Sequence, residues 1–168
     1  MATREEIING IQLLIQESQR VAGSLTAADW ARAQDMDGWK NNQVLAHVAS
    51  VGGMVAPMMQ GMVNAPDGAN AGAGIDIDAL NAAMVGQRKD KAIDDLAAEV
   101  KTAYTAAIEH IRTVSDDVLA KPVSFRGYEN VPLSDVLIRM VVLHGLAHIY
   151  GAYAAVFNSV DQQPAAAS

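Results

Sequence analysis

The 168-residue sequence contains no cysteine, and this absence excludes several kinds of chemistry at once. The chain can form no disulfide bond, no thiolate metal site and no cysteine nucleophile. Any thiol chemistry would need a thiol supplied by a bound molecule. Aromatic residues are also scarce, at 5%, although 51% of the residues are hydrophobic. A core built mainly from alanine, valine, leucine, isoleucine and methionine favours helices over a β-sandwich or a barrel.

Basic residues are also few. The chain has 12 lysines and arginines against 19 aspartates and glutamates, which gives a formal net charge of -7. Nucleic-acid binding depends on clustered basic side chains that contact phosphates. We therefore expect no nucleic-acid partner, and a small molecule is the more natural ligand.

The first ten residues, MATREEIING, are charged and lack the apolar stretch of a signal peptide, so a cytoplasmic location is the default expectation. One internal segment, Val44–Val63, has no charged residue and is long enough to raise the membrane question. It contains His47, Ser50, Pro57 and three glycines, however. A helix that is apolar all round can also be the buried centre of a bundle. We expect that second role and no membrane partner.

Apolar residues recur with helical spacing over four long segments. They predict helices over residues 3–24, 41–63, 77–114 and 132–158. Asn41 or Asn42 should cap the second helix, and a capping-box pair of threonine and aspartate, TAAD, predicts a short turn between the first two. We expect one domain over residues 1–158, followed by a solvated tail over 159–168.

The connector NAPDGANAGAGID, residues 64–76, has no periodicity. Thirteen residues can span roughly 43 Å when extended, whereas a twenty-residue helix is only about 30 Å long. The second and third helices can therefore be parallel, joined by a crossover, in an all-α four-helix bundle of up-down-down-up order. A second connector, residues 120–132, is also predicted to be irregular.

The apolar fourth segment carries two histidines in the stretch VLHGLAHIYG. His144 and His148 are four residues apart, so on a helix they lie on one face and can share a metal ion. They can also be buried histidines that hydrogen-bond to backbone or to a neighbour. A third histidine, His47, lies in the other apolar helix, whereas His110 lies on the charged third helix and is predicted to be solvated.

Three imidazoles that meet in a core would be costly without partners, on the order of 2 kcal/mol for each unsatisfied group. A divalent ion bound by His47, His144 and His148 would satisfy all three. Three protein ligands leave one coordination position open, which is the catalytic pattern. The faces that carry these histidines predict four pocket-lining residues: Gln43, Ser50, Met54 and Val141.

Further side chains leave two interpretations open. The methionine cluster of the second helix, Met54, Met58, Met59 and Met62, is either core filling or an adaptable pocket wall. Arg88 either fixes local structure or binds a substrate carboxylate, and the first role is the more common for arginine in ion-pair networks. Arg126 lies in the second connector and is a candidate at the mouth of the bundle.

Three stretches are similar to a known group of proteins. GWKNNQVLAHVA, HGLAHIYG and DIDALNAAMVGQRKD resemble segments of the DinB-like superfamily, which includes the N-terminal domains of mycothiol-dependent maleylpyruvate isomerases. The resemblance runs from the first helix to Phe157. Lys40 and the apolar residues 51–54 depart from the family pattern, so the substrate is left open.

The resemblance implies an up-down-down-up four-helix bundle that binds a divalent ion, zinc or nickel, through His47, His144 and His148. It also implies a low-molecular-weight thiol as cosubstrate and an S-transferase or isomerase type of reaction on a small molecule. The alternative is a non-catalytic metal- or small-ligand-binding bundle with a stress-related role. In either case we expect a homodimer, from the resemblance and from apolar residues on the first and third helices.

Overall fold

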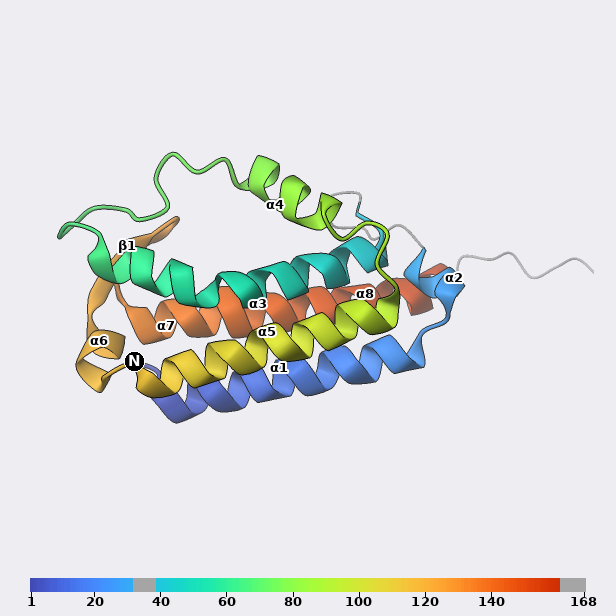
Figure 1. Cartoon of the computed structure of the whole chain (residues 1–168), viewed down its shortest axis with the longest axis horizontal. Coiled ribbons are helices and arrows are strands. Elements are labelled where there is room, and N and C mark those ends of the chain that lie inside the picture. The colour runs from blue at the N-terminus through green and yellow to red at the C-terminus, as the bar shows by residue number, and fades with distance from the viewer. Residues whose placement is uncertain (32–38, 161–168) are drawn as a thin grey trace, which may run out of the picture.

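The structure is a computed structural model that describes residues 1–31 and 39–160 (Figure 1). Four long helical segments lie side by side: α1 (Arg4–Ser24), α3 (Asn41–Asn64), α5 (Ile93–Thr113), and a last segment made of α7 (Leu133–Leu137), η1 (Ile138–Leu143) and α8 (His144–Val160). Figure 1 shows α3 and α5 running in the same direction, opposite to α1 and to the last segment. The fold is mostly helical, which confirms the helical class expected from composition.

Local capping signals explain how the first helices begin. The Thr3 side chain accepts a hydrogen bond from the Glu6 backbone N–H, and the Glu6 carboxylate accepts one from the Thr3 N–H at 2.7 Å. Thr26 and Asp29 form the same reciprocal pair at the start of α2 (Ala27–Trp30), where the sequence predicts it. Each pair satisfies two backbone N–H groups that the first helical turn leaves free.

The predicted cap of α3 is wrong. The helix begins after Lys40, whose backbone N–H donates to the Gln43 side chain at 2.8 Å. Asn41 is buried as the first helical residue, and its amide donates to the carbonyls of Asp29 and Ala152, each at 3.2 Å. Tertiary packing therefore takes the side chain that could otherwise have capped the helix.

The single helix predicted over residues 77–114 is also wrong, because it is two helices, α4 (Ile77–Gly86) and α5. None of the linking residues 87–92 is buried, so no apolar contact holds them in a continuous helix. Arg88 fixes the break: its guanidinium donates to the Glu99 carboxylate at 2.9 Å and to the Met84 carbonyl at 2.9 Å. Arg88 thus has a structural role. The chain returns along the bundle through residues 65–76 and α4 together, and α4 lies over α3 (Figure 1).

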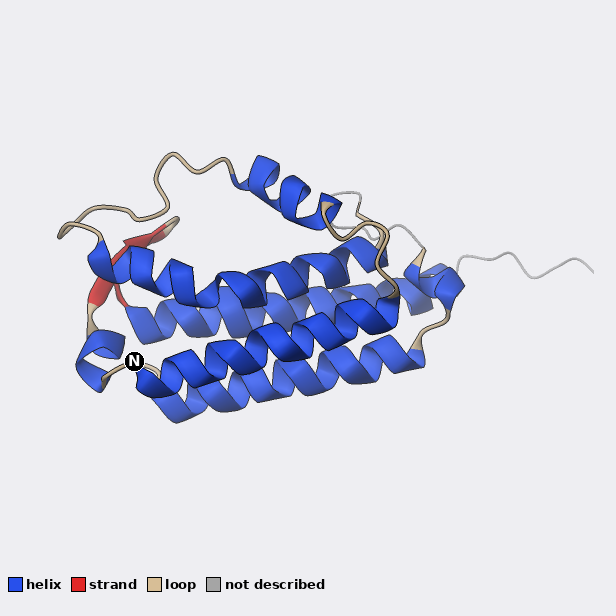
Figure 2. Ribbon diagram, in the orientation of Figure 1, coloured by secondary structure: helices blue, strands red, loops and turns tan. Residues whose placement is uncertain are grey.

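The connector predicted to be irregular contains a β-hairpin (Figure 2). Strand β1 (Pro122–Phe125) pairs antiparallel with β2 (Tyr128–Pro132), after a short helix α6 (Asp116–Ala120). Val123 and Phe125 are buried on alternate positions, the pattern of a half-buried strand. The strands were too short to stand out in the sequence, and they form against the rest of the bundle.

The last segment contains a π-helical turn, η1, directly before His144. The predicted start of the fourth helix is confirmed, whereas the π turn was not predicted. Among the described residues, one helical run, Leu133–Val156, is long and apolar enough to cross a membrane. This is weak evidence, because core helices pass the same test, and 44% of its most apolar window is buried inside the protein.

Candidate metal centre

The three histidines singled out in the sequence meet in the bundle interior. His47 comes from α3, and His144 and His148 come from successive turns of α8. The His144 Nε2 atom lies 3.1 Å from Nε2 of His47 and 3.2 Å from Nε2 of His148. One ligand atom from each residue lies within 4.8 Å of the others. Nitrogens that share a tetrahedral zinc ion with bonds near 2.1 Å lie about 3.4 Å apart, so the arrangement has the spacing of a metal site.

Hydrogen bonding alone does not account for this cluster. A neutral imidazole nitrogen either donates or accepts, so His144 Nε2 cannot serve both of its neighbours in full. His47 and His148 are buried, and the Nδ1 atom of His47 has no hydrogen-bond partner among the described residues. Trp39 packs edge-on against His47, with ring centroids 5.3 Å apart. The three imidazoles are placed so that they could hold a divalent ion.

The surroundings keep the imidazoles in the state that a metal requires. Burial, together with smaller contributions from the neighbouring His148 and His144, lowers the pKa of His47 to about 3. Burial also lowers the pKa of His144, and the positive charge of Arg126 acts in the same direction. Metal ligation needs neutral imidazole, so protons compete weakly for these two ligands at neutral pH.

As the pH falls, this site should therefore lose less zinc affinity than a site made of three histidines with ordinary pKa values. Three imidazoles with pKa values near 6.5 would together lose about a thousandfold in affinity between pH 7.5 and 5.5. Since His47 does not take up a proton in that window, we expect a loss of about a hundredfold or less. Zinc titrations of metal-free protein at the two pH values measure the loss, and a thousandfold drop would contradict the protection by burial.

A cavity of about 310 Å³ lies beside the triad. His47 and His144 are part of its wall. The remaining walls come from α3, from the loop before α4, from α4 itself, from the hairpin and from η1: Val51, Met54, Pro57, Met58, Gly61, Ala71, Ile75, Ile77, Leu80, Asn81, Met84, Phe125, Arg126 and Met140. The candidate metal centre is thus open to a space that can hold a small molecule.

Of the four residues predicted to line a pocket, Met54 is in this wall and three are not. Gln43 caps α3 instead. Ser50 is buried and donates to the Ala46 carbonyl of its own helix at 2.8 Å. Val141 is fully buried in the π turn. Each of these side chains already has a structural partner, which sequence spacing alone does not reveal.

The methionine cluster divides between the two roles that the sequence left open. Met54 and Met58 line the cavity, whereas Met59 and Met62 are buried in the core. Sequence reasoning did not place Leu80 and Met84 of α4 at a cavity, because apolar spacing alone does not distinguish a cavity wall from a core. His110 lies on α5 and is not one of the grouped histidines.

Comparison with known proteins agrees with this architecture. Residues 11–150 match the family described as mycothiol maleylpyruvate isomerase N-terminal domain. Two solved structures are similar in fold: mycothiol-dependent maleylpyruvate isomerase, at 15% identity and TM-score 0.62, and a histidine-to-alanine mutant of such an enzyme, at 17% and 0.62. They cover 93% and 86% of this chain, which spans 60% of each of them. None of the curated proteins matches the sequence.

Proposed function

Because the chain belongs to the family of mycothiol maleylpyruvate isomerase N-terminal domains, we propose that it is a metal-dependent enzyme that joins a low-molecular-weight thiol to a small electrophile. In this proposal His47, His144 and His148 bind one divalent ion, zinc or nickel. The observation that carries the proposal is the convergence of three imidazole nitrogens at the wall of an apolar cavity. The reaction is of S-transferase or isomerase type.

The chemistry proposed for the metal ion follows from its three histidine ligands. Three histidines leave one coordination position free, and two of them, His47 and His144, face the cavity. A bound divalent ion would lower the pKa of a thiol at that position and so supply a thiolate at neutral pH. The thiol has to come from outside, since the chain has no cysteine.

The residues of the chain supply binding and the exclusion of water. No aspartate or glutamate is among the described residues that line the cavity, so no fixed negative charge opposes a thiolate or another anion there. The apolar wall removes water from around the sulfur, which strengthens electrostatic interactions at the site. Arg126 adds positive charge on the same side as His144.

The alternative is a bundle that binds a metal or a small ligand without turnover, in a stress-related role. A triad sealed in the core would favour that alternative, whereas two of the three histidines here contact the cavity. This contact is the reason for preferring an enzyme.

The proposal predicts a rate gain that depends on metal. Metal-loaded protein should accelerate adduct formation between mycothiol and 1-chloro-2,4-dinitrobenzene by at least about a hundredfold over metal-free protein, the scale expected of one electrostatic contribution. Adduct absorbance measures the rate, and a parallel assay with maleylpyruvate distinguishes transfer from isomerisation. Protein that binds one metal ion but accelerates neither reaction would favour the non-catalytic alternative.

Several further predictions concern the whole molecule. We propose that the helices form an up-down-down-up bundle, that the domain ends near residue 158, and that the protein is a cytoplasmic homodimer. Leu13 of α1 is exposed, which agrees with an apolar surface on the first helix. Two other large exposed apolar side chains, Leu143 and Tyr150, belong to the last segment. Sedimentation at micromolar concentration tests the dimer against the 17.7 kDa monomer.

A further inference from the structure

The cavity beside the triad is elongated along α3. Its residues on that helix form one stripe that begins at His47 and ends at Gly61, with Met54 and Met58 between them. At about 1.5 Å per residue, the stripe is roughly 21 Å long. The ligand that fills such a space is extended rather than compact.

The opposite wall is equally apolar. Ile77, Leu80 and Met84 come from one face of α4, and Ile75 precedes them in the loop. Methionine side chains adapt to irregular ligands because they are unbranched and polarisable. Apart from the two histidines, the described lining residues with a polar side chain are Asn81 and Arg126. The cavity therefore suits a ligand that is mostly hydrocarbon.

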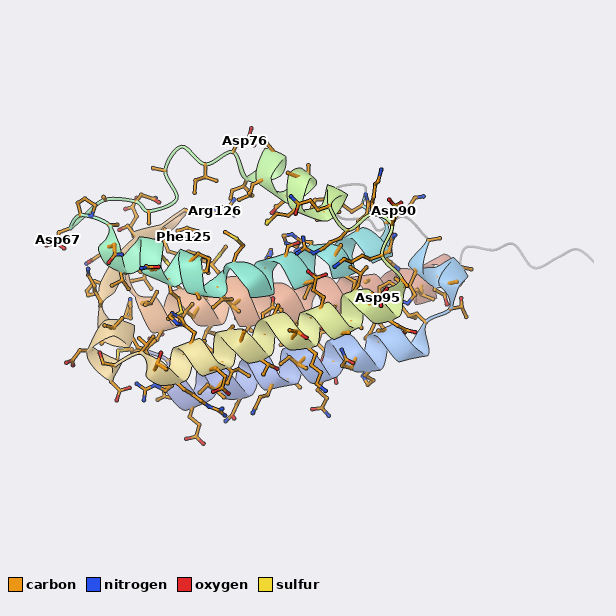
Figure 3. The ribbon with its side chains drawn as sticks, viewed as in Figure 1. Asp67, Asp76, Asp90, Asp95, Phe125 and Arg126 are labelled. Carbon is orange, nitrogen blue, oxygen red and sulfur yellow. The ribbon has the colours of Figure 1, made fainter. Side chains whose placement is uncertain are left out.

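Arg126 stands out among these residues because of its backbone and its charge. It lies at the hairpin tip beside Phe125, next to the loop that leads to α4 (Figure 3). Its φ angle is 52°, in the left-handed region that costs a non-glycine residue free energy. The Asn70 side chain holds this turn, accepting hydrogen bonds from the backbone N–H of Arg126 at 2.9 Å and of Gly72 at 3.0 Å.

The guanidinium of Arg126 has no carboxylate partner among the described residues. In a chain with 19 acidic residues, this makes it an unbalanced positive charge on the wall of a cavity. A planar guanidinium matches a carboxylate in geometry and can donate two parallel hydrogen bonds to it. The turn thus presents an anion-binding group at a fixed place near the triad.

We propose that the cavity binds an elongated, mainly apolar electrophile with a single carboxylate, and that Arg126 binds this carboxylate. The inference rests on the proposed function, since it assigns the substrate of the same site. A compound with two carboxylates fits less well, because Arg126 is the one cationic side chain among the described wall residues and the free position of the proposed metal ion is assigned to the thiol. The carboxylate anchors the compound beside the triad, and its hydrocarbon part lies along α3.

Octanoate and 1-octanol are matched probes for this proposal, since they share a chain and differ in charge. Calorimetric titration of metal-free wild-type protein should show octanoate binding about fivefold more tightly than octanol, the scale of an ionic contact at a partly exposed site. Arg126→Gln should abolish this preference and leave octanol affinity within about twofold. Arg126→Lys should retain part of it. Equal binding of the two probes to wild type would overturn the proposal.

Arg139→Gln is the control, because Arg139 stacks on Tyr128 with its guanidinium carbon 5.5 Å from the ring centroid and is not part of the cavity wall. It should keep the full preference for octanoate. The proposal would also be overturned if Arg126→Gln kept the preference for octanoate over octanol. Loss of octanol binding in both Arg126 variants would overturn it too. So would Arg126-dependent binding of glutathione without any preference for octanoate, which would assign the arginine to the thiol.

The test is independent of the proposed function. The probes do not react and the protein is metal-free, so a failure of metal binding or of turnover leaves the octanoate result unchanged. Conversely, loss of the octanoate preference in Arg126→Gln should leave zinc content unaltered, which elemental analysis of the same variant establishes.

Discussion

Replacing His47, His144 or His148 with alanine should lower zinc affinity by more than about a hundredfold, because two imidazoles and water form a much poorer site than three imidazoles. Protein purified without an affinity tag should hold about one ion per chain in the wild type and only a small fraction of that in each variant. Elemental analysis measures the content directly. The effect should be similar for all three residues, since the His144 Nε2 atom lies at comparable distances, 3.1 and 3.2 Å, from the other two.

His110→Ala is the matched control for these variants. The residue is the fourth histidine of the chain, and it lies on α5 outside the group. Its replacement should leave metal content unchanged. A metal that binds the native state alone also raises stability, by an amount that grows with the logarithm of the free metal concentration. Excess zinc should therefore raise the melting temperature of wild type and of His110→Ala but not of the triad variants. Wild-type protein that takes up no zinc or nickel at pH 7.5 would refute the centre.

Gly52→Ala should destabilise the protein by about 1–2 kcal/mol, although alanine is normally the better helix former. A Cβ atom at this position would lie 2.8 Å from two ring carbons of Tyr104 and 3.0 Å from the Cβ of Ala103. Tyr104 is fully buried, so its ring cannot move aside without disturbing the core. The glycine lets α3 and α5 approach closely. Urea unfolding, followed by circular dichroism, measures the free energy of unfolding.

The neighbouring glycine gives a control of opposite sign. A Cβ at Gly53 would have nothing within 4 Å. Gly53→Ala should therefore stabilise the protein, by up to about 1 kcal/mol, through helix propensity and a less flexible unfolded chain. If the two variants changed stability in the same direction, the close approach of Gly52 to Tyr104 would not control packing between α3 and α5.

The sequence predicted those elements whose signals are local. The helix at residues 3–24 has apolar periodicity and the turn at Thr26 has a capping pair, and α1 and α2 begin where these signals place them. The convergence of the three histidines was predicted from a different signal, their placement in the two most apolar helices. Buried imidazoles need partners, and in this chain they have each other.

Elements fixed by distant contacts were not predictable. The break between α4 and α5 depends on the ion pair of Arg88 with Glu99, whose nitrogen and oxygen are 2.7 Å apart. The hairpin is joined to the loop before α4, where the Ala71 N–H donates to the Ser124 carbonyl at 2.9 Å. Neither contact has a signature in spacing along the chain. The cavity wall depends on both, and so most of its residues were missed.

The π turn explains why Val141 is not part of the cavity wall. The sequence reading placed Val141 on the same face as His144 and His148 by assuming 3.6 residues per turn throughout. In a π-helix the hydrogen bonds span five residues, so the residues before and after it are out of α-helical phase. Residues 138–143 adopt this conformation, and Val141 points into the core while His144 faces the cavity.

The separation of the metal ligands along the chain has a consequence for folding. His47 and His144 are 97 residues apart in sequence, yet their Nε2 atoms lie 3.1 Å from each other. An ion bound by both would act as a reversible cross-link that closes a loop of more than half the chain and restricts the unfolded state. In this protein, which has no cysteine, a bound zinc ion would restrict the unfolded chain as a disulfide bond does in other proteins. Its loss would loosen the attachment of α8 to α3 first, and cellular metal supply would set how long the chain survives proteolysis.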